Sequence, residues 1–162
     1  MFVGGGYDTG YESENYVQNN TVGGGAGVYM FDANTGDLLW WTSANATEAR
    51  GAEAYTNTST NSINMKYSVV SQINAIDRDS DGLVDHLYFG DLRGQTFRVD
   101  LNNLATTKVD FATRVVRLFY HSDLVNPVPR FYEMPSFSVH DDGNNRLIGA
   151  VAFSSEIGRA HV

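Results

Sequence analysis

The sequence predicts an all-β fold. It contains 16 glycines, nine tyrosines and nine phenylalanines but only three prolines among 162 residues, which is typical of strands joined by tight turns. Short apolar and aromatic runs alternate with Gly, Asn and Asp, and no segment has the periodicity of an amphipathic helix. Hydrophobic residues make up 42% of the chain, too many for a disordered segment. We therefore expect one domain of antiparallel strands.

Three hairpins are expected along the chain. In the first, residues 28–31 and 38–41 form strands around a turn at 34–36. The second spans 86–101 and turns at Gly90-Asp91-Leu92-Arg93-Gly94, and the third spans 136–153 and turns at 141–145. Each combines two apolar or aromatic runs with a turn rich in Gly, Asn or Asp, which is the pattern of a hairpin.

Two connecting segments have a different composition. Residues 42–62 are rich in Ser, Thr, Asn and Ala, so we expect a surface excursion there. Residues 123–135 contain all three prolines and predict an extended connector. The segments "VYMFDANTGDLLWW" and "TFRVDLNNLATTKVDF" share a weak internal sequence similarity. Together with the three hairpins, this similarity indicates repeated sheet units, such as propeller blades of about 40–50 residues each.

The overall charge limits the classes of partner. The net charge is −8, which argues against nucleic acid or an anionic membrane surface and suits a divalent cation. No run approaches the length of a membrane span, and the first residues lack the pattern of a secretion signal. We expect either a cytosolic protein or an internal piece of a longer one. The absence of cysteine excludes disulfides and thiolate metal sites.

One acidic loop, residues 77–85, carries the pattern D-x-D-x-D-G-x-x-D. Calcium takes six to eight oxygen ligands at about 2.3–2.6 Å, and carboxylates at alternate positions of a tight loop converge on one point. The glycine, Gly82, permits the sharp turn. The expected calcium ligands are Asp77, Asp79, Asp81, the main-chain carbonyl of Leu83, and Asp85.

Electrostatic repulsion is the physical reason to expect an ion in this loop. Two carboxylates about 5 Å apart repel by roughly 3 kcal/mol at an effective dielectric near 20. The loop is not a complete EF-hand, because Tyr88 replaces the bidentate glutamate and the flanking segments resemble strands. This loss predicts a weak site suited to calcium-rich surroundings outside the cell, and magnesium is less favoured. The alternative is a solvated aspartate-rich turn.

The remaining motifs favour structural roles. The glycine runs "GGGYDTG" and "GGGAG" lack the strand and helix that a dinucleotide fold needs, so we interpret them as turns. The histidines have no metal-ligand spacing, and no nucleophile elbow is present. Trp40 and Trp41 can form a sugar platform, but core packing is the better interpretation. We therefore expect no catalytic residues and no enzymatic activity.

Three segments resemble the C-terminal β-propeller of the type IV pilus tip-associated assembly factors and adhesins, the PilY/PilC family. They are "GVYMFDANTGDLLWW", "INAIDRDSDGLVDHLYFGDLRGQTFRVDL" and "RFYEMPSFSVHDDGNNRLIGAVAFSS", and they extend over most of 27–155. The second is the most specific, because it couples the aspartate loop to a Y-x-G-D-x-x-G hairpin. The hairpins are also similar to the blades of quinoprotein-type propellers.

This resemblance implies an incomplete β-propeller of about three blades over residues 1–155, with the EF-hand-like calcium loop inserted between strands. About three blades cannot close a ring, so we expect a fragment of a larger protein. Residues 156–162 depart from the family's continuation and look like a translated sequencing adapter, which makes them a non-native tail.

The resemblance also implies a role. A secreted, non-enzymatic protein at the outer surface or pilus tip would support pilus extension against retraction, twitching motility and attachment. Its partners would be pilus tip components and host or abiotic surfaces, and the five calcium ligands are carried over to the positions given above.

Two alternative functions remain. One is a quinone-dependent dehydrogenase, although such enzymes often carry a vicinal cysteine pair that this chain lacks. The other is a calcium-stabilised surface scaffold unrelated to pili.

Overall fold

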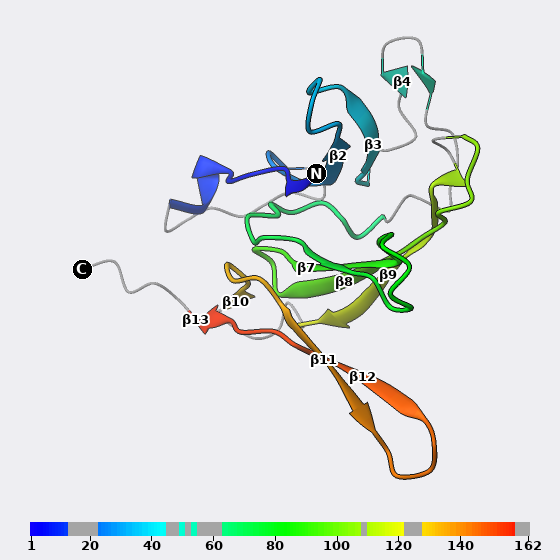
Figure 1. Cartoon of the computed structure of the whole chain (residues 1–162). Helices are drawn as coiled ribbons and strands as arrows, with labels where there is room; N and C mark the ends of the chain where they lie inside the picture. Colours follow the sequence, from blue (N-terminus) through cyan, green and yellow to red (C-terminus); the bar gives the residue numbers. More distant parts are fainter. Residues whose placement is uncertain are drawn as a thin grey trace.

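The computed structural model describes residues 1–12, 23–44, 49–50, 53–54, 63–107, 110–121 and 128–157 (Figure 1). In this part of the chain, thirteen strands and a single 3₁₀ helix, η1 (Thr9–Glu12), are present. The strands form separate antiparallel sheets, and none of these sheets closes on itself. The all-β prediction is therefore confirmed, whereas a propeller ring and its number of blades remain predictions. None of the helices described is long and apolar enough to cross a membrane.

The first sheet has the order β1 (Phe2–Gly4), β2 (Val28–Phe31) and β3 (Leu38–Thr42). Strands β2 and β3 are the first predicted hairpin. Their turn forms because Asp32 Oδ1 accepts hydrogen bonds from the backbone N–H groups of Asn34 (2.7 Å) and Thr35 (3.1 Å). Gly36 then closes the turn at a φ of +79°, a conformation that glycine adopts at little cost.

The second sheet has four strands in the order β6 (Asn74–Ile76), β7 (His86–Gly90), β8 (Gln95–Leu101) and β9 (Ala112–Tyr120). Strands β7 and β8 are the second predicted hairpin. The acidic loop joins β6 to β7, and β9 pairs with the far edge of β8 with two irregularities in register. Strand β9 has no counterpart among the predicted hairpins.

The main core joins these two sheets. Its largest fully buried side chains include Trp40 from the first sheet and Phe89 and Phe97 from the second. Phe89 and Phe97 lie opposite each other on neighbouring strands with ring centroids 5.4 Å apart. Trp40 and Trp41 are only 1% and 7% exposed, so their predicted role in core packing is confirmed. The acidic loop is thus attached to strands that are anchored by a well-packed core.

The third predicted hairpin forms a separate two-stranded sheet, β11 (Ser136–Asp141) and β12 (Leu147–Ala152). In Figure 1 it projects away from the rest of the molecule. Its base contacts the second sheet: the ring of Phe137 stacks on that of Tyr88 at 5.9 Å, and Asn74 Nδ2 donates to the carbonyl of Pro135 at 2.7 Å.

Four very short strands complete the description. Strand β4 (Ala49–Arg50) pairs with β5 (Glu53–Ala54), and β10 (Pro129–Arg130) pairs with β13 (Glu156–Ile157). Most of the expected excursion at 42–62 and residues 123–127 of the expected connector lie outside the described residues. Of the expected tail, the structure describes only 156–157, which form β13, so its non-native origin stays a prediction.

Candidate metal centre

The acidic loop, residues 77–85, is held at its carboxyl-terminal end by two backbone hydrogen bonds. The N–H of Asp85 donates to the carbonyl of Ile76 at 2.8 Å, and the carbonyl of Asp85 accepts from the N–H of Leu101 at 2.8 Å. These bonds tie the end of the loop to β6 on one side and to β8 on the other. Residues 78–83 between the two ends are exposed to solvent.

Asp77 shapes the loop from within. Its Oδ1 accepts from the N–H of Ser80 at 2.6 Å, and its Oδ2 accepts from the N–H of Gly82 at 2.8 Å. Ser80 and Gly82 both lie in the left-handed region, with φ of +65° and +91°. The reversal at Gly82 is therefore of the kind that the sequence predicted, because a glycine adopts this conformation without strain.

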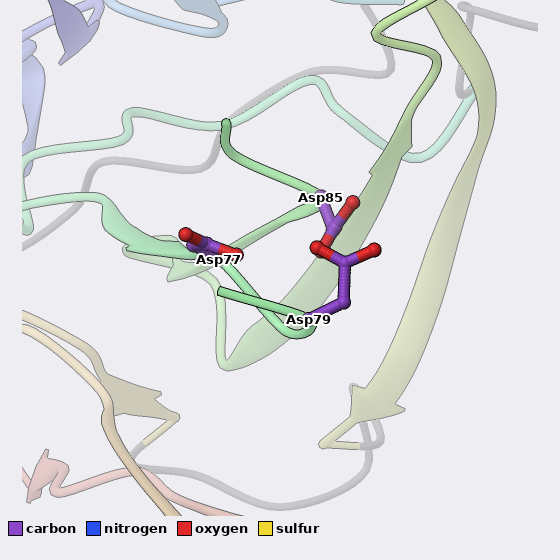
Figure 2. A group of neighbouring side chains, drawn as sticks. All are labelled: Asp77, Asp79 and Asp85. Carbon is purple, nitrogen blue, oxygen red and sulfur yellow. The ribbon is translucent and has the colours of Figure 1, made fainter. Parts of the chain in front are cut away.

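The loop brings three of its carboxylates together. One oxygen from each of Asp77, Asp79 and Asp85 lies within 4.8 Å of the others (Figure 2). Two oxygens that bind the same calcium at about 2.4 Å are at most about 4.8 Å apart. The spacing of the three carboxylates is thus compatible with one shared cation. Asp85 Oδ2 also accepts from the N–H of Arg78 at 2.7 Å, which fixes this side chain across the loop.

The structure does not bring all of the predicted ligands together. Asp81 is outside the group of three, and its Oδ1 accepts from the N–H of Leu83 at 2.8 Å. The side chain of Leu83 is 49% exposed. The coordination by Asp81 and by the carbonyl of Leu83 stays a prediction.

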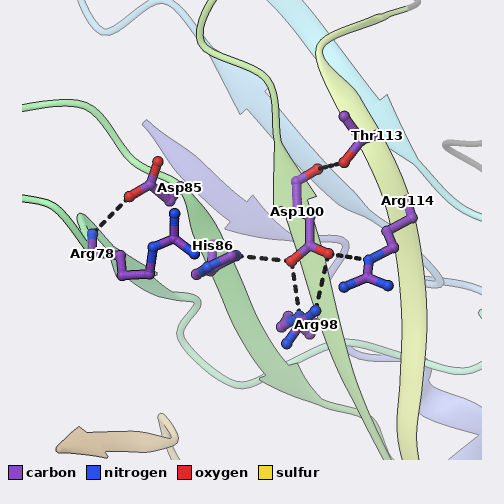
Figure 3. Close-up of polar contacts among 7 residues, drawn as sticks. All are labelled: Arg78, Asp85, His86, Arg98, Asp100, Thr113 and Arg114. Carbon is purple, nitrogen blue, oxygen red and sulfur yellow. Dashed lines mark hydrogen bonds and ion pairs between the residues drawn. The ribbon is translucent and has the colours of Figure 1, made fainter. Parts of the chain in front are cut away.

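A basic cluster lies directly behind the loop, on β7, β8 and β9 (Figure 3). Asp100 is its centre: Oδ1 lies 2.8 Å from His86 Nδ1 and 2.8 Å from Arg98 Nε, and Oδ2 contacts Arg98 and Arg114. Burial alone would raise the pKa of Asp100, but the two arginines outweigh it and hold this pKa below its ordinary value. Asp100 therefore stays ionised and balances part of the cluster's positive charge.

This cluster was missed from the sequence. His86, interpreted there only as a structural or surface residue, lies directly opposite Asp100, and Asp100 lies directly opposite Arg114. The signal was the cross-strand register of the three strands, in which opposite residues interact. Reading it requires knowing that β9 pairs with β8. Because His86 follows Asp85 in the chain, the cluster fixes the strand on which the loop ends.

A second carboxylate was also missed. Asp91, placed by the sequence in the turn between β7 and β8, is completely buried. Burial raises the pKa of Asp91 to about 7, although hydrogen bonds from Gln95 and from the N–H of Arg93 and the charge of Arg117 act to lower it.

The turn also explains the Y-x-G-D-x-x-G motif: a Cβ on Gly90 would lie 2.4 Å from the Cβ of Phe131, and Gly94 has a φ of +74°.

Comparisons were made with protein-family models, curated proteins and solved structures. None of the three gives a match. The functional proposal therefore depends on the geometry of the acidic loop and on the sequence motifs.

Proposed function

We propose that the chain is a non-catalytic, calcium-binding β-sheet module and that residues 77–85 hold the ion. The observation that carries this proposal is the convergence of Asp77, Asp79 and Asp85 within 4.8 Å. Like charges at such separations repel by a few kcal/mol, and a divalent cation removes this cost.

The donor set favours calcium among the metal ions. The loop offers carboxylate and carbonyl oxygens and no cysteine, and hard oxygen donors suit calcium or magnesium rather than zinc or copper. Three carboxylates leave further positions for Asp81, the Leu83 carbonyl and water, which matches the large and flexible shell of calcium. Magnesium prefers to keep several waters in a strict octahedron.

The loop's attachments indicate what a bound ion would do. Its last residue, Asp85, is bonded to β6 and to the end of β8, and the next residue, His86, contacts Asp100. Calcium would pull Asp77, at the end of β6, toward Asp85, at the start of β7. The ion would therefore stabilise this edge of the four-stranded sheet and supply no chemistry to a substrate.

For the biological setting, we propose a protein of the cell exterior or pilus tip that acts in pilus dynamics and attachment. This setting is supported by the sequence resemblance of the three segments to the PilY/PilC family. It also agrees with the net charge of −8 and with the weak site expected without the glutamate. Immunolabelling of intact producing cells tests it. Labelling at pili supports the setting, and labelling only after lysis contradicts it.

Calorimetric titration of the full chain with calcium tests the binding. We expect one site that weakens at least tenfold in Asp77→Asn, because this change removes one charge and one ligand. Asp37→Asn is the matched control, since Asp37 is an exposed turn aspartate in another hairpin and its loss should leave the affinity unchanged. Equal calcium affinity in the wild type and in Asp77→Asn would rule out the site.

A further inference from the structure

Asp91 lies where the turn between β7 and β8 meets three other segments. The N–H of Leu92 donates to the carbonyl of Ser68 at 3.0 Å, and the carbonyl of Asp91 accepts from the N–H of Phe131 at 3.1 Å. The carbonyl of Gly94 accepts from the N–H of His121 at 3.0 Å. The turn is thus a junction of segment 63–71, the end of β9 and segment 128–131.

Among the described residues, Asp91's carboxylate accepts hydrogen bonds from three donors. Its Oδ1 accepts from the N–H groups of Arg93 (2.9 Å) and Gln95 (3.0 Å), and its Oδ2 accepts from the side-chain Nε2 of Gln95 (2.7 Å). The arrangement therefore matches the ionised form of the group, which only accepts hydrogen bonds. Burial opposes that same form, because a desolvated charge is costly.

The side chain of Gln95 also forms hydrogen bonds with Asn64 and Arg117, on the side away from Asp91. It is 1% exposed, its Nε2 also donates to the carbonyl of Asn64 at 2.9 Å, and its Oε1 accepts from Arg117 Nη1 at 2.9 Å. Gln95 therefore relays the negative charge of Asp91 to the positive charge of Arg117. Its amide can satisfy all three neighbours in one orientation only, with Oε1 toward the guanidinium.

A proton taken up from solvent by Oδ2 changes this arrangement. The new O–H is a donor that faces the N–H₂ group of Gln95, and a buried donor without an acceptor costs about 1–3 kcal/mol. If the amide rotates by half a turn, Oε1 accepts from Asp91. Nε2 then faces the guanidinium of Arg117, and Oε1 faces the carbonyl of Asn64. Protonation therefore either leaves the new O–H without an acceptor or, after the rotation, breaks the hydrogen bonds of Gln95 to Asn64 and Arg117.

We propose that the turn is a proton-sensitive clamp. In this clamp the charge of Asp91 sets the orientation of Gln95, and Gln95 in turn holds Asn64 and Arg117 to the turn. The ionised state holds segment 63–71 and β9 together at the junction. In the neutral state Gln95 gives up its hydrogen bonds to Asn64 and Arg117, whereas the backbone hydrogen bonds of the junction remain.

Burial places the transition near neutral pH, and the charged groups around the junction lower the pKa of Asp91 only in part. Arg117 is the cation whose charge acts on Asp91, and it does so from behind Gln95. The guanidinium groups of Arg93 and Arg130 lie over the rings of Tyr67 and Tyr11, His121 contributes its backbone N–H, and segment 63–71 carries Lys66. Burial raises the pKa of Asp91 to about 7, so modest acidification would switch the clamp.

Nuclear magnetic resonance on the full chain tests the clamp through the side-chain amide signals of Gln95. In the wild type we expect these signals to shift with a midpoint at about pH 7. In Asp91→Asn the transition should disappear, because nothing titrates at that position. In Asp37→Asn, an exposed aspartate of another turn, it should remain.

Two results would overturn the clamp. One is a Gln95 signal that does not change between about pH 5 and 8.5 in the wild type. The other is a transition that persists unchanged in Asp91→Asn. If that variant does not fold, the carboxyl ¹³C signal of Asp91 in the wild type replaces it. Its midpoint must then coincide with that of the Gln95 amide, and a difference of more than about one pH unit contradicts the coupling.

Discussion

Asp91, in the turn before strand β8, and Asp100, near the end of that strand, are two buried carboxylates whose pKa values are shifted in opposite directions. Asp91 is surrounded by neutral donors, with Arg117 reaching it only through Gln95, and its pKa is raised to about 7. Asp100 touches His86, Arg98 and Arg114, and its pKa is lowered. Burial acts to raise both pKa values and is complete only at Asp91, whereas direct contact with Arg98 and Arg114 reverses the direction of the shift at Asp100.

The largest expected effect concerns Asp91 and pH. Its folded pKa lies above its unfolded pKa of 3.8, because the cost of burying the charge outweighs the hydrogen bonds that favour the ionised form. This group's contribution to stability is therefore complete below pH 3.8 and is lost as the pH rises to about 7, even though the neutral form makes fewer hydrogen bonds through Gln95. The loss amounts to on the order of 4 kcal/mol. Urea unfolding of wild type and Asp91→Asn at several pH values measures it as a difference. A difference that is constant across this range would contradict the buried charge.

Gly90→Ala should reduce the pKa difference between Asp91 and Asp100, because it opens the turn that buries Asp91. A Cβ there would lie 2.4 Å from the Cβ of Phe131, so Gly90→Ala must displace Phe131, at a cost of about 2–3 kcal/mol. Water would then reach Asp91 and flatten its pH dependence. Gly36→Ala is the control, because no atom lies within 4 Å of a Cβ at Gly36, so its cost comes from the positive φ alone. It should cost only about 1 kcal/mol and leave the pH dependence unchanged.

Asp100→Asn tests whether the charge of Asp100 stabilises the fold through its cationic partners. It leaves Arg98 and His86 close together with the central charge removed, and we expect a loss of about 2 kcal/mol at neutral pH, reduced from a fully buried case because Arg114 is 60% exposed. Since the folded pKa is lowered, the stability from Asp100 is present above its unfolded pKa and is lost as the pH falls below it. Thermal unfolding at neutral and acidic pH should show the two curves converging in acid. A gap that widens in acid would contradict this assignment.

The sequence predicted features that depend on neighbouring residues and missed those that depend on distant ones. The three hairpins follow from local turn chemistry, as in the bonds from Asp32 to its own turn. The left-handed Gly82 is equally local. The partners of Asp100 come from three strands, and the burial of Asp91 depends on Phe131 and on segment 63–71. Such contacts require the sheet order and register, which no single segment encodes.

The smallest expected effect concerns the acidic loop, whose carboxylates form no ion pair with a protein cation among the described residues. Asp77 and Asp79 lie in an exposed loop beside Asp85, so we expect an ion from solution to take the place that Arg98 and Arg114 hold at Asp100. A calcium concentration ten times the dissociation constant should stabilise the fold by about 1.4 kcal/mol. Thermal unfolding of the full chain with calcium and with excess chelator measures this difference. Asp79→Asn should reduce it, whereas Asp37→Asn should not. The repulsion among the exposed carboxylates is also screened by salt in general. If the calcium effect disappears when the ionic strength is held constant, the loop is a solvated turn and not a calcium site.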